Sequence, residues 1–184
     1  MNTLSLCRIA TLAGAAILVA CDATGPRMGQ VDVRLQDGPA NIASATVWVS
    51  KVYLVGEQGR FTITETPAQY DLLTLQNGVT ALLGSALIPV GSYEQLRLVV
   101  DSARVTLASG NTFSDGTTEK TLKVPSGDTS GLKVNFAGPV MVDPGHTTVT
   151  VDFDVSQSFV FQGNASMPNG VLFTPVLHGS VTTS

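Results

Sequence analysis

The sequence predicts an all-β protein that folds as an antiparallel β-sandwich. Many short segments alternate apolar and polar residues with a period of two, which is the pattern of half-buried strands. Gly, Pro, Asn, Asp and Ser residues form turn signals between these segments, as is typical of sandwiches. No segment of ten or more residues shows a helical period, so helix is expected only as a turn or two within 79–83.

The strands at the start of the domain are predicted from alternation and from one hairpin turn. The segment 31–35 alternates apolar and polar side chains, so it is the first strand. The segment 45–55 is apolar on both faces, which predicts a central strand with Trp48 in the core. A turn at 56–59 then predicts a hairpin into the strand 61–64.

The segment 71–100 is the part of the chain around which the rest must pack. It predicts a strand, a turn at 76–78, an irregular apolar segment, a second turn at 89–93 and another strand. In the second turn, Gly91 is expected to need a positive φ that only glycine adopts easily. Tyr93 is expected to pack at the rim of the sandwich.

The second half of the chain continues the pattern of short strands. The apolar phase slips near Asp101 and Ser102, which predicts a β-bulge or a short break. The polar segment 109–118 predicts a loop or a hairpin tip. The remaining strands are expected within 122–124, 132–136, 149–155, 159–161 and 171–177.

The N-terminal residues 1–20 have the organisation of a lipoprotein signal peptide. Their apolar run, 9–19, is much shorter than the roughly 20 residues that a membrane-spanning helix needs. The run closes on Leu18, Val19, Ala20 and Cys21, which resembles the bacterial lipobox. The resemblance implies that Leu18, Val19 and Ala20 are recognised by the signal peptidase and that Cys21 becomes the lipidated N-terminus. The alternative is a plain secretory signal with an incidental cysteine.

Lipidation at Cys21 predicts a protein that is anchored to a membrane of the bacterial cell envelope. Palmitate and similar acyl chains hold stably when two or more are attached, because each buried methylene contributes about 0.8 kcal/mol. Asp22 resembles the signal that keeps lipoproteins of enteric bacteria on the inner membrane, and it weakly favours that destination. Residues 21–29 then form the lipidated cysteine and a short tether, and residues 30–184 form one sandwich domain.

Composition excludes several partners and sites. Charged residues make up 13% of the chain, and after cleavage nine basic and fourteen acidic side chains remain. The lysines that remain are scattered and form no basic stripe in the sequence, so nucleic acid is not an expected partner. With Cys21 lipidated no other cysteine is left, which excludes a disulfide or a thiolate metal site in the domain.

The candidate catalytic and metal-binding residues favour structural explanations. Asp152 and Asp154 are expected on one solvated strand face, although with Asp143 they could hold calcium. No G-x-S-x-G motif accompanies the only histidines, His146 and His178. We therefore expect no enzyme activity, no cofactor and no metal.

Two other groups of residues have features of a catalytic or binding site. The segment 130–133 fits S-x-x-K, but it is expected to be part of a turn that leads to an exposed Lys133. Four aromatic side chains could together form a platform for sugar rings: Trp48, Tyr53, Tyr70 and Tyr93. Core packing is the favoured explanation for Trp48.

The motif D-L-L-x-L-Q-N-G-V-T-A-L-L-G, together with Leu122 to Gly127 and Ser130 to Lys133, resembles the domain of unknown function DUF4382 of bacterial lipoproteins. The resemblance covers about 29–184. It implies a fold and a location, and no catalytic residues. The turn at Pro89, Gly91 and Tyr93 is also similar to that of transthyretin-like and collagen-adhesin B-type sandwiches, so a transthyretin-like or immunoglobulin-like sandwich is expected.

These observations predict a membrane-anchored, non-catalytic lipoprotein domain that acts by binding or by structural display. Its partner would be a protein or a glycan of the envelope. A carbohydrate-binding or adhesin-type module is the first alternative, which an exposed aromatic row would favour. An envelope enzyme of unrecognised type is the second.

Overall fold

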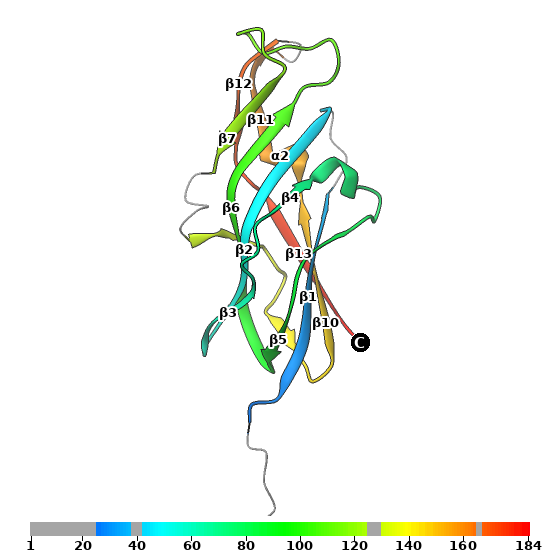
Figure 1. Ribbon diagram of the computed structural model, residues 1–184, viewed down its shortest axis with the longest axis vertical. Coiled ribbons are helices and arrows are strands. Elements are labelled where there is room, and N and C mark those ends of the chain that lie inside the picture. Colours follow the sequence, from blue (N-terminus) through cyan, green and yellow to red (C-terminus); the bar gives the residue numbers. More distant parts are fainter. Residues whose placement is uncertain (1–24, 38–41, 125–129, 165–166) are drawn as a thin grey trace, which may run out of the picture.

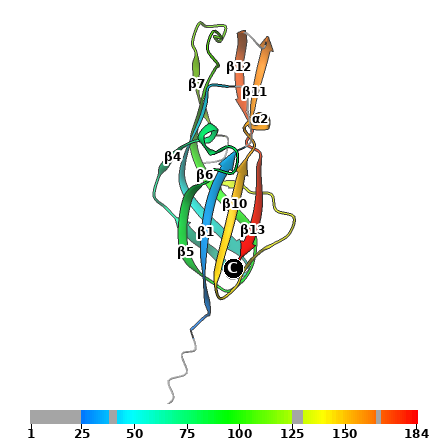
Figure 2. The same cartoon turned by 90° about the vertical axis from the view of Figure 1, so that its right-hand side faces the viewer.

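The computed structural model describes residues 25–37, 42–124, 130–164 and 167–184, and it consists almost entirely of β-structure. A seven-stranded sheet and a four-stranded sheet form two layers (Figures 1 and 2). A two-stranded sheet lies toward one end of the long axis, and the first strand begins at the opposite end (Figure 1). The prediction of an all-β sandwich is confirmed.

The described elements follow the chain in a regular order, with two short helical segments among the strands. They are β1 (Met28–Asp37), β2 (Ser44–Gly56), β3 (Gly59–Thr64), β4 (Ala68–Asp71), the 3-10 helix η1 (Leu72–Leu75), β5 (Ala81–Pro89), β6 (Gly91–Thr106), β7 (Glu119–Lys123), β8 (Leu132–Lys133), β9 (Val140–Val142), β10 (His146–Phe153), α2 (Val155–Ser158), β11 (Phe159–Asn164), β12 (Met167–Phe173) and β13 (Leu177–Thr183). None of the helices in these residues is long and apolar enough to cross a membrane.

The seven-stranded sheet is built around β2 and β6, which pair with each other along most of their length. β3 and β4 pair with the other edge of β2, and β7, β8 and β9 pair with the other edge of β6. The segment 45–55 is therefore a central strand, as its two apolar faces predict.

The four-stranded sheet has the order β13-β10-β1-β5 and contains a parallel ladder, which departs from the antiparallel prediction. β1 and β10 pair in parallel from Gln30 opposite His146 to Asp37 opposite Phe153. The other ladders between described strands are antiparallel. Alternation along each strand predicts which face is buried, but it carries no information about the direction of a partner more than 100 residues away.

The core lies between the inner faces of the two sheets. Alternate residues of β1 and β10 contribute fully buried side chains, and β2 and β6 face them with a matching set. Complete burial of an aliphatic or aromatic side chain contributes about 2 kcal/mol, so the alternation accounts for much of the stability of the fold. The fully buried residues of these strands include Val31, Val33, Leu35, Val149, Val151, Phe153, Val52, Leu54, Leu96 and Leu98.

The slip in apolar phase near Asp101 is a pair of bulges, one on each central strand. The register of β2 and β6 shifts at Val49, so that Asp101 on β6 and Ser50 on β2 have no direct partner. The hydroxyl of Ser50 donates a hydrogen bond of 2.7 Å to the Asp101 carboxylate. The predicted β-bulge is confirmed, and both strands keep their apolar side chains on the core face across it.

The prediction for the segment 71–83 is wrong in two places. Leu72 to Leu75 was expected to extend a strand, but it forms the 3-10 helix η1. The helical turn expected within 79–83 is absent, because Ala81 begins β5. Asp71 explains the first difference, since its carboxylate accepts a hydrogen bond of 3.2 Å from the Leu73 amide and caps the helix.

A second short helix was also missed. The predicted strand 149–155 ends at Phe153, and α2 begins at Val155. Asp154 caps this helix by accepting a hydrogen bond of 3.0 Å from the Gln157 amide. An acidic cap followed three residues later by Gln is a known helix-start pattern, so the sequence did contain the signal.

Candidate functional site

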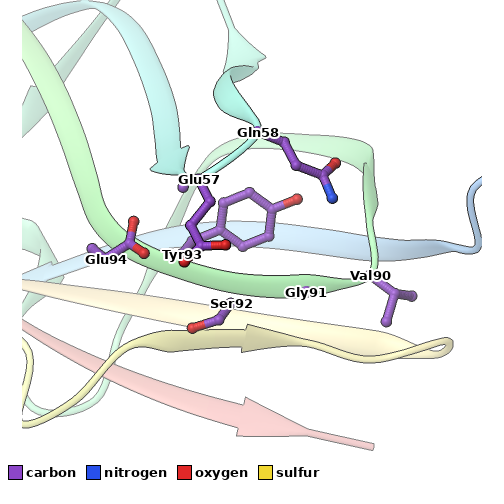
Figure 3. A pocket seen from close by; sticks show the side chains of 8 residues that line it. Glu57, Gln58, Val90, Gly91, Ser92, Tyr93 and Glu94 are labelled. Carbon is purple, nitrogen blue, oxygen red and sulfur yellow. The ribbon is translucent and has the colours of Figure 1, made fainter.

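A pocket of about 290 Å³ lies between two turns, at the end of the sandwich where β1 begins (Figure 3). The turn between β2 and β3 forms one wall, and the turn between β5 and β6 forms the other. The Val90 amide donates a hydrogen bond of 2.8 Å to the carbonyl of Arg27, which joins the second turn to the start of the domain. The lining residues are Gly56, Glu57, Gln58, Val90, Gly91, Ser92, Tyr93 and Glu94.

Tyr93 is the buried member of this lining. Its ring meets the ring of Phe61 edge-on, with the centroids 5.6 Å apart. Its hydroxyl donates a hydrogen bond of 2.7 Å to the carbonyl of Pro89, which fixes the turn, and burial raises the pKa of Tyr93. Tyr93 thus packs at the rim of the sandwich, as the sequence predicts.

The two glycines of the pocket have different constraints. Gly91 has a φ of 159°, a backbone conformation that residues with a side chain rarely adopt, although a Cβ atom there would contact nothing within 4 Å. The expectation that Gly91 has a positive φ is therefore confirmed. Gly56 is constrained by space instead, because a Cβ atom would lie 2.9 Å from both the Ser92 carbonyl oxygen and Cδ1 of Tyr93.

The polar lining of the pocket is acidic and amidic. Glu57 and Glu94 contribute carboxylates and Gln58 contributes an amide, and all three side chains are exposed. None of the lining residues is cationic. The pocket can therefore accept hydrogen bonds from a solvent-exposed donor.

The three candidate metal ligands do not converge. Asp143 precedes β10 and Asp152 lies near the other end of that strand, a separation of about 20 Å at the usual rise per residue. Asp154 is committed to the cap of α2, where Ser156 and Gln157 also donate to its carboxylate. Within the described ranges, no group of three or more His, Cys, Asp or Glu side chains could hold a metal ion.

Asp152 and Asp154 also differ in environment, contrary to the expectation of one solvated face. Burial, followed by the charge of Asp154, raises the pKa of Asp152, and its Oδ1 is buried without a hydrogen-bond partner in the described structure. The hydrogen bond from Ser156 lowers the pKa of Asp154. The difference arises because β10 ends between the two residues.

The two histidines lie at opposite ends of the outer face of the four-stranded sheet. His146 begins β10, and its Nε2 lies 3.2 Å from Oδ2 of Asp32 on β1. His178 is on β13, opposite Asp152. Ser85 donates a hydrogen bond to Asp32, which lowers the pKa of that carboxyl, and His146 adds to the effect. Asp32 accepts from a serine instead of activating it, so this cluster does not have the order of groups in a catalytic triad.

The four aromatic residues considered as a platform are divided between the two sides of the seven-stranded sheet. Tyr70 and Tyr93 pack toward the core. Trp48 and Tyr53 lie on the outer side, since their neighbours along β2 belong to the core. The expectation that Trp48 is a core residue is wrong: it is half-buried, and the guanidinium of Arg104 lies 5.3 Å from its ring centroid. Local alternation could not choose between the two apolar faces of this strand.

The segment 130–133 is held against the seven-stranded sheet through the backbone carbonyl of its first residue. The carbonyl of Ser130 accepts hydrogen bonds from the Tyr53 hydroxyl, at 2.7 Å, and from the Arg97 guanidinium, at 3.1 Å. Lys133 is exposed on β8, opposite Arg97 on β6, as its predicted solvent-facing position requires. The remainder of the predicted turn, 125–129, lies outside the described residues.

The predicted lipidation site lies outside the described residues as well. This applies to the signal peptide 1–20, including Leu18, Val19 and Ala20, to Cys21 and to Asp22. The described chain begins at Gly25, only a few residues after Cys21.

Comparison with known proteins identifies a family without an established activity. The sequence model of the family described as "Domain of unknown function (DUF4382)" matches residues 28–168. The match begins at the first residue of β1 and ends in β12, so β13 extends the four-stranded sheet beyond it. Searches of curated proteins and of solved structures gave no match. Because the matched region covers most of the chain, the protein belongs to the DUF4382 family.

Proposed function

We propose that this protein is a lipid-anchored lipoprotein of the bacterial cell envelope, and that its sandwich acts by binding or display without catalysis. The observation that carries the proposal is the position of the Leu18-Val19-Ala20-Cys21 sequence, seven residues before the first residue of β1. Acyl chains on Cys21 would hold the protein at a membrane.

The shape of the domain supports display. Seven residues of extended chain span at most about 25 Å, so the tether would keep the start of β1 near the bilayer. β6 has 16 residues and runs along the long axis, which corresponds to about 50 Å of strand. The end formed by β7, β11 and β12 would therefore project away from the anchored end (Figure 1).

Three of the described polar side chains support a non-catalytic role, because each of the three has a structural partner. Asp154 caps α2, Asp32 accepts from Ser85, and the Tyr93 hydroxyl donates to Pro89. A carbohydrate-binding module is the second candidate, and the outward position of Trp48 is the observation that favours it.

Metabolic labelling with a palmitate analogue tests the anchor. Cys21→Ala should abolish incorporation of the label and should release the protein from the membrane fraction or leave an unprocessed precursor. Cys7→Ala is the matched control, since it removes the other cysteine of the chain from within the signal peptide and should leave labelling unchanged. Labelling that survives Cys21→Ala would contradict the proposal.

A further inference from the structure

The outer side of the seven-stranded sheet collects most of the basic side chains that follow Cys21. Nine lysines and arginines follow Cys21, and six of them lie on this side. Strand pairing brings them together from five strands, although they are scattered in the sequence. The six residues, here called the cationic face, are Lys51, Arg60, Arg97, Arg104, Lys123 and Lys133.

The arginines of the cationic face are positioned by neutral groups. Arg60 lies 5.4 Å from the ring centroid of Tyr53, and Arg104 lies 5.3 Å from that of Trp48. Arg97 donates to the carbonyls of Ser130 and Gly131, at 3.1 and 3.2 Å. Rings and carbonyls orient a guanidinium without removing its charge, so these groups are ordered but remain available to an anion.

Five carboxylates lie on or beside the same side of the sheet: Glu65, Asp71, Glu94, Asp101 and Glu119. Of the ion pairs between described residues, only Lys51 with Glu65, at 2.5 Å, involves a member of the cationic face. The other five cations have no carboxylate within ion-pair distance in this part of the chain.

Two members of the cationic face, Arg97 and Lys133, are directly opposite each other on β6 and β8, and both lie on the side away from the core. Like charges in this arrangement repel each other and weaken strand pairing. An anion placed between them would relieve the repulsion, which makes this pair a point of attachment for a ligand.

The dimensions of the cationic face suit a linear ligand. Arg104 is opposite Thr46 on β2, and Arg60 is opposite Val55, nine residues further along the same strand. That separation corresponds to about 30 Å at the usual rise per residue. The cations therefore extend along the strands as a stripe that passes Trp48 and Tyr53.

We propose that the cationic face binds an anionic glycan, a carbohydrate polymer that carries carboxylate or phosphate groups. The arginines and lysines would pair with the anionic groups, and the partly exposed ring of Trp48 would contact the apolar face of a sugar. This inference rests on the proposed function, because the proposed location in the cell envelope brings the domain close to such polymers. Binding itself does not require the anchor.

A glycan fits this surface better than a bilayer does. Membrane-surface binding would combine the cations with apolar side chains that enter the headgroup region. Of the large hydrophobic side chains that the described structure exposes, only Met141 belongs to the seven-stranded sheet. The face therefore offers charge and one aromatic ring, without an apolar surface that could enter a membrane.

Binding to polygalacturonate, measured with detergent-solubilised full-length protein, tests the proposal. The triple variant Arg60→Gln, Arg104→Gln, Lys123→Gln should lose about tenfold or more in affinity. The matched control Arg27→Gln, Arg34→Gln, Lys120→Gln changes the net charge equally on other surfaces and should lose less than about twofold. Melting temperatures of both variants, and the single substitutions, separate lost binding from lost folding.

Two further ligands identify the chemistry that is recognised. Poly-L-glutamate carries carboxylates without sugar rings and should bind more weakly than polygalacturonate, and Trp48→Leu should reduce that difference. Vesicles of phosphatidylglycerol should bind no better than vesicles of phosphatidylcholine. The proposal is overturned if polygalacturonate does not bind, if both triple variants lose affinity equally, or if only the anionic vesicles bind. None of these outcomes affects the labelling test of the anchor, so the two proposals fail separately.

Discussion

Gly179 on β13 lies against the ring of Phe136, and the ring occupies the space that a Cβ atom at Gly179 would need. Gly179 is opposite Val151 on β10, so its missing side chain would point to the core face. The Gly179 amide donates a hydrogen bond of 2.8 Å to the carbonyl of Asn135. This contact joins the segment that follows β8 to the edge of the four-stranded sheet.

Gly179→Ala should therefore destabilise the domain by about 1–3 kcal/mol, because the added methyl group forces Phe136 out of its position. Urea unfolding measures the change. Gly138→Ala is the matched control, since a Cβ atom there meets nothing within 4 Å. Equal free energies of unfolding for the two variants would show that Phe136 does not pack against β13 in this way.

The opposed cations Arg97 and Lys133 give a prediction of the opposite sign. Lys133→Glu should stabilise the domain by about 0.5 kcal/mol at low ionic strength, and added salt should reduce the gain. Lys123→Glu, which faces the neutral Ser102, should give a smaller change. A double-mutant cycle with Arg97→Gln isolates the pair, and a coupling of zero would contradict the repulsion.

Asp152 should make stability depend on pH in an unusual direction. Its pKa is raised in the folded protein, chiefly by burial. Folding therefore favours its protonated form, and the ionised form costs stability once the pH is above the folded pKa. Asp152→Asn should raise the melting temperature at pH 7, and the gain should vanish as the pH falls below the unfolded pKa. A loss of stability at pH 7 would contradict this environment for Asp152.

Asp32, on the same sheet face, is the matched control for that experiment. Its pKa is lowered, chiefly by the hydrogen bond from Ser85. Its contribution is present above the unfolded pKa and is lost as the pH falls through the folded pKa. Asp32→Asn should therefore lower the melting temperature at pH 7 and lose its effect in acid, with the opposite sign to Asp152→Asn.

Removal of divalent cations should leave the melting temperature unchanged. A metal that bound only the folded protein would stabilise it in proportion to its saturation. Asp143 and Asp152 lie too far apart to share an ion. The carboxylate of Asp154 is occupied by the cap of α2. A melting temperature that falls by several degrees with EDTA and returns with calcium would contradict this prediction.

Local patterns predicted the strands well, because alternation reports directly which side chains are buried. The alternating segment from Val149 to Phe153 is a strand, as predicted, and the phase slip at Asp101 is a β-bulge, as predicted. The segments that were missed are η1 and α2, where Asp71 and Asp154 act through a few hydrogen bonds. Such short helices leave no periodic trace.

Features that depend on pairing between distant strands could not be predicted. The parallel ladder of β1 and β10 and the cationic face both arise from register, which a single sequence does not reveal. The outward position of Trp48 has the same origin, because β2 is apolar on both faces and its partners determine which face is covered. The candidate site was therefore less predictable than the fold.

The chemical identity of the mature N-terminus tests the central claim, a lipid-anchored domain, most directly. Mass spectrometry of the membrane-extracted protein should find an N-terminal peptide that begins at Cys21 and carries the added mass of acyl chains. A mature N-terminus at any other residue, or an unmodified Cys21, would contradict the account.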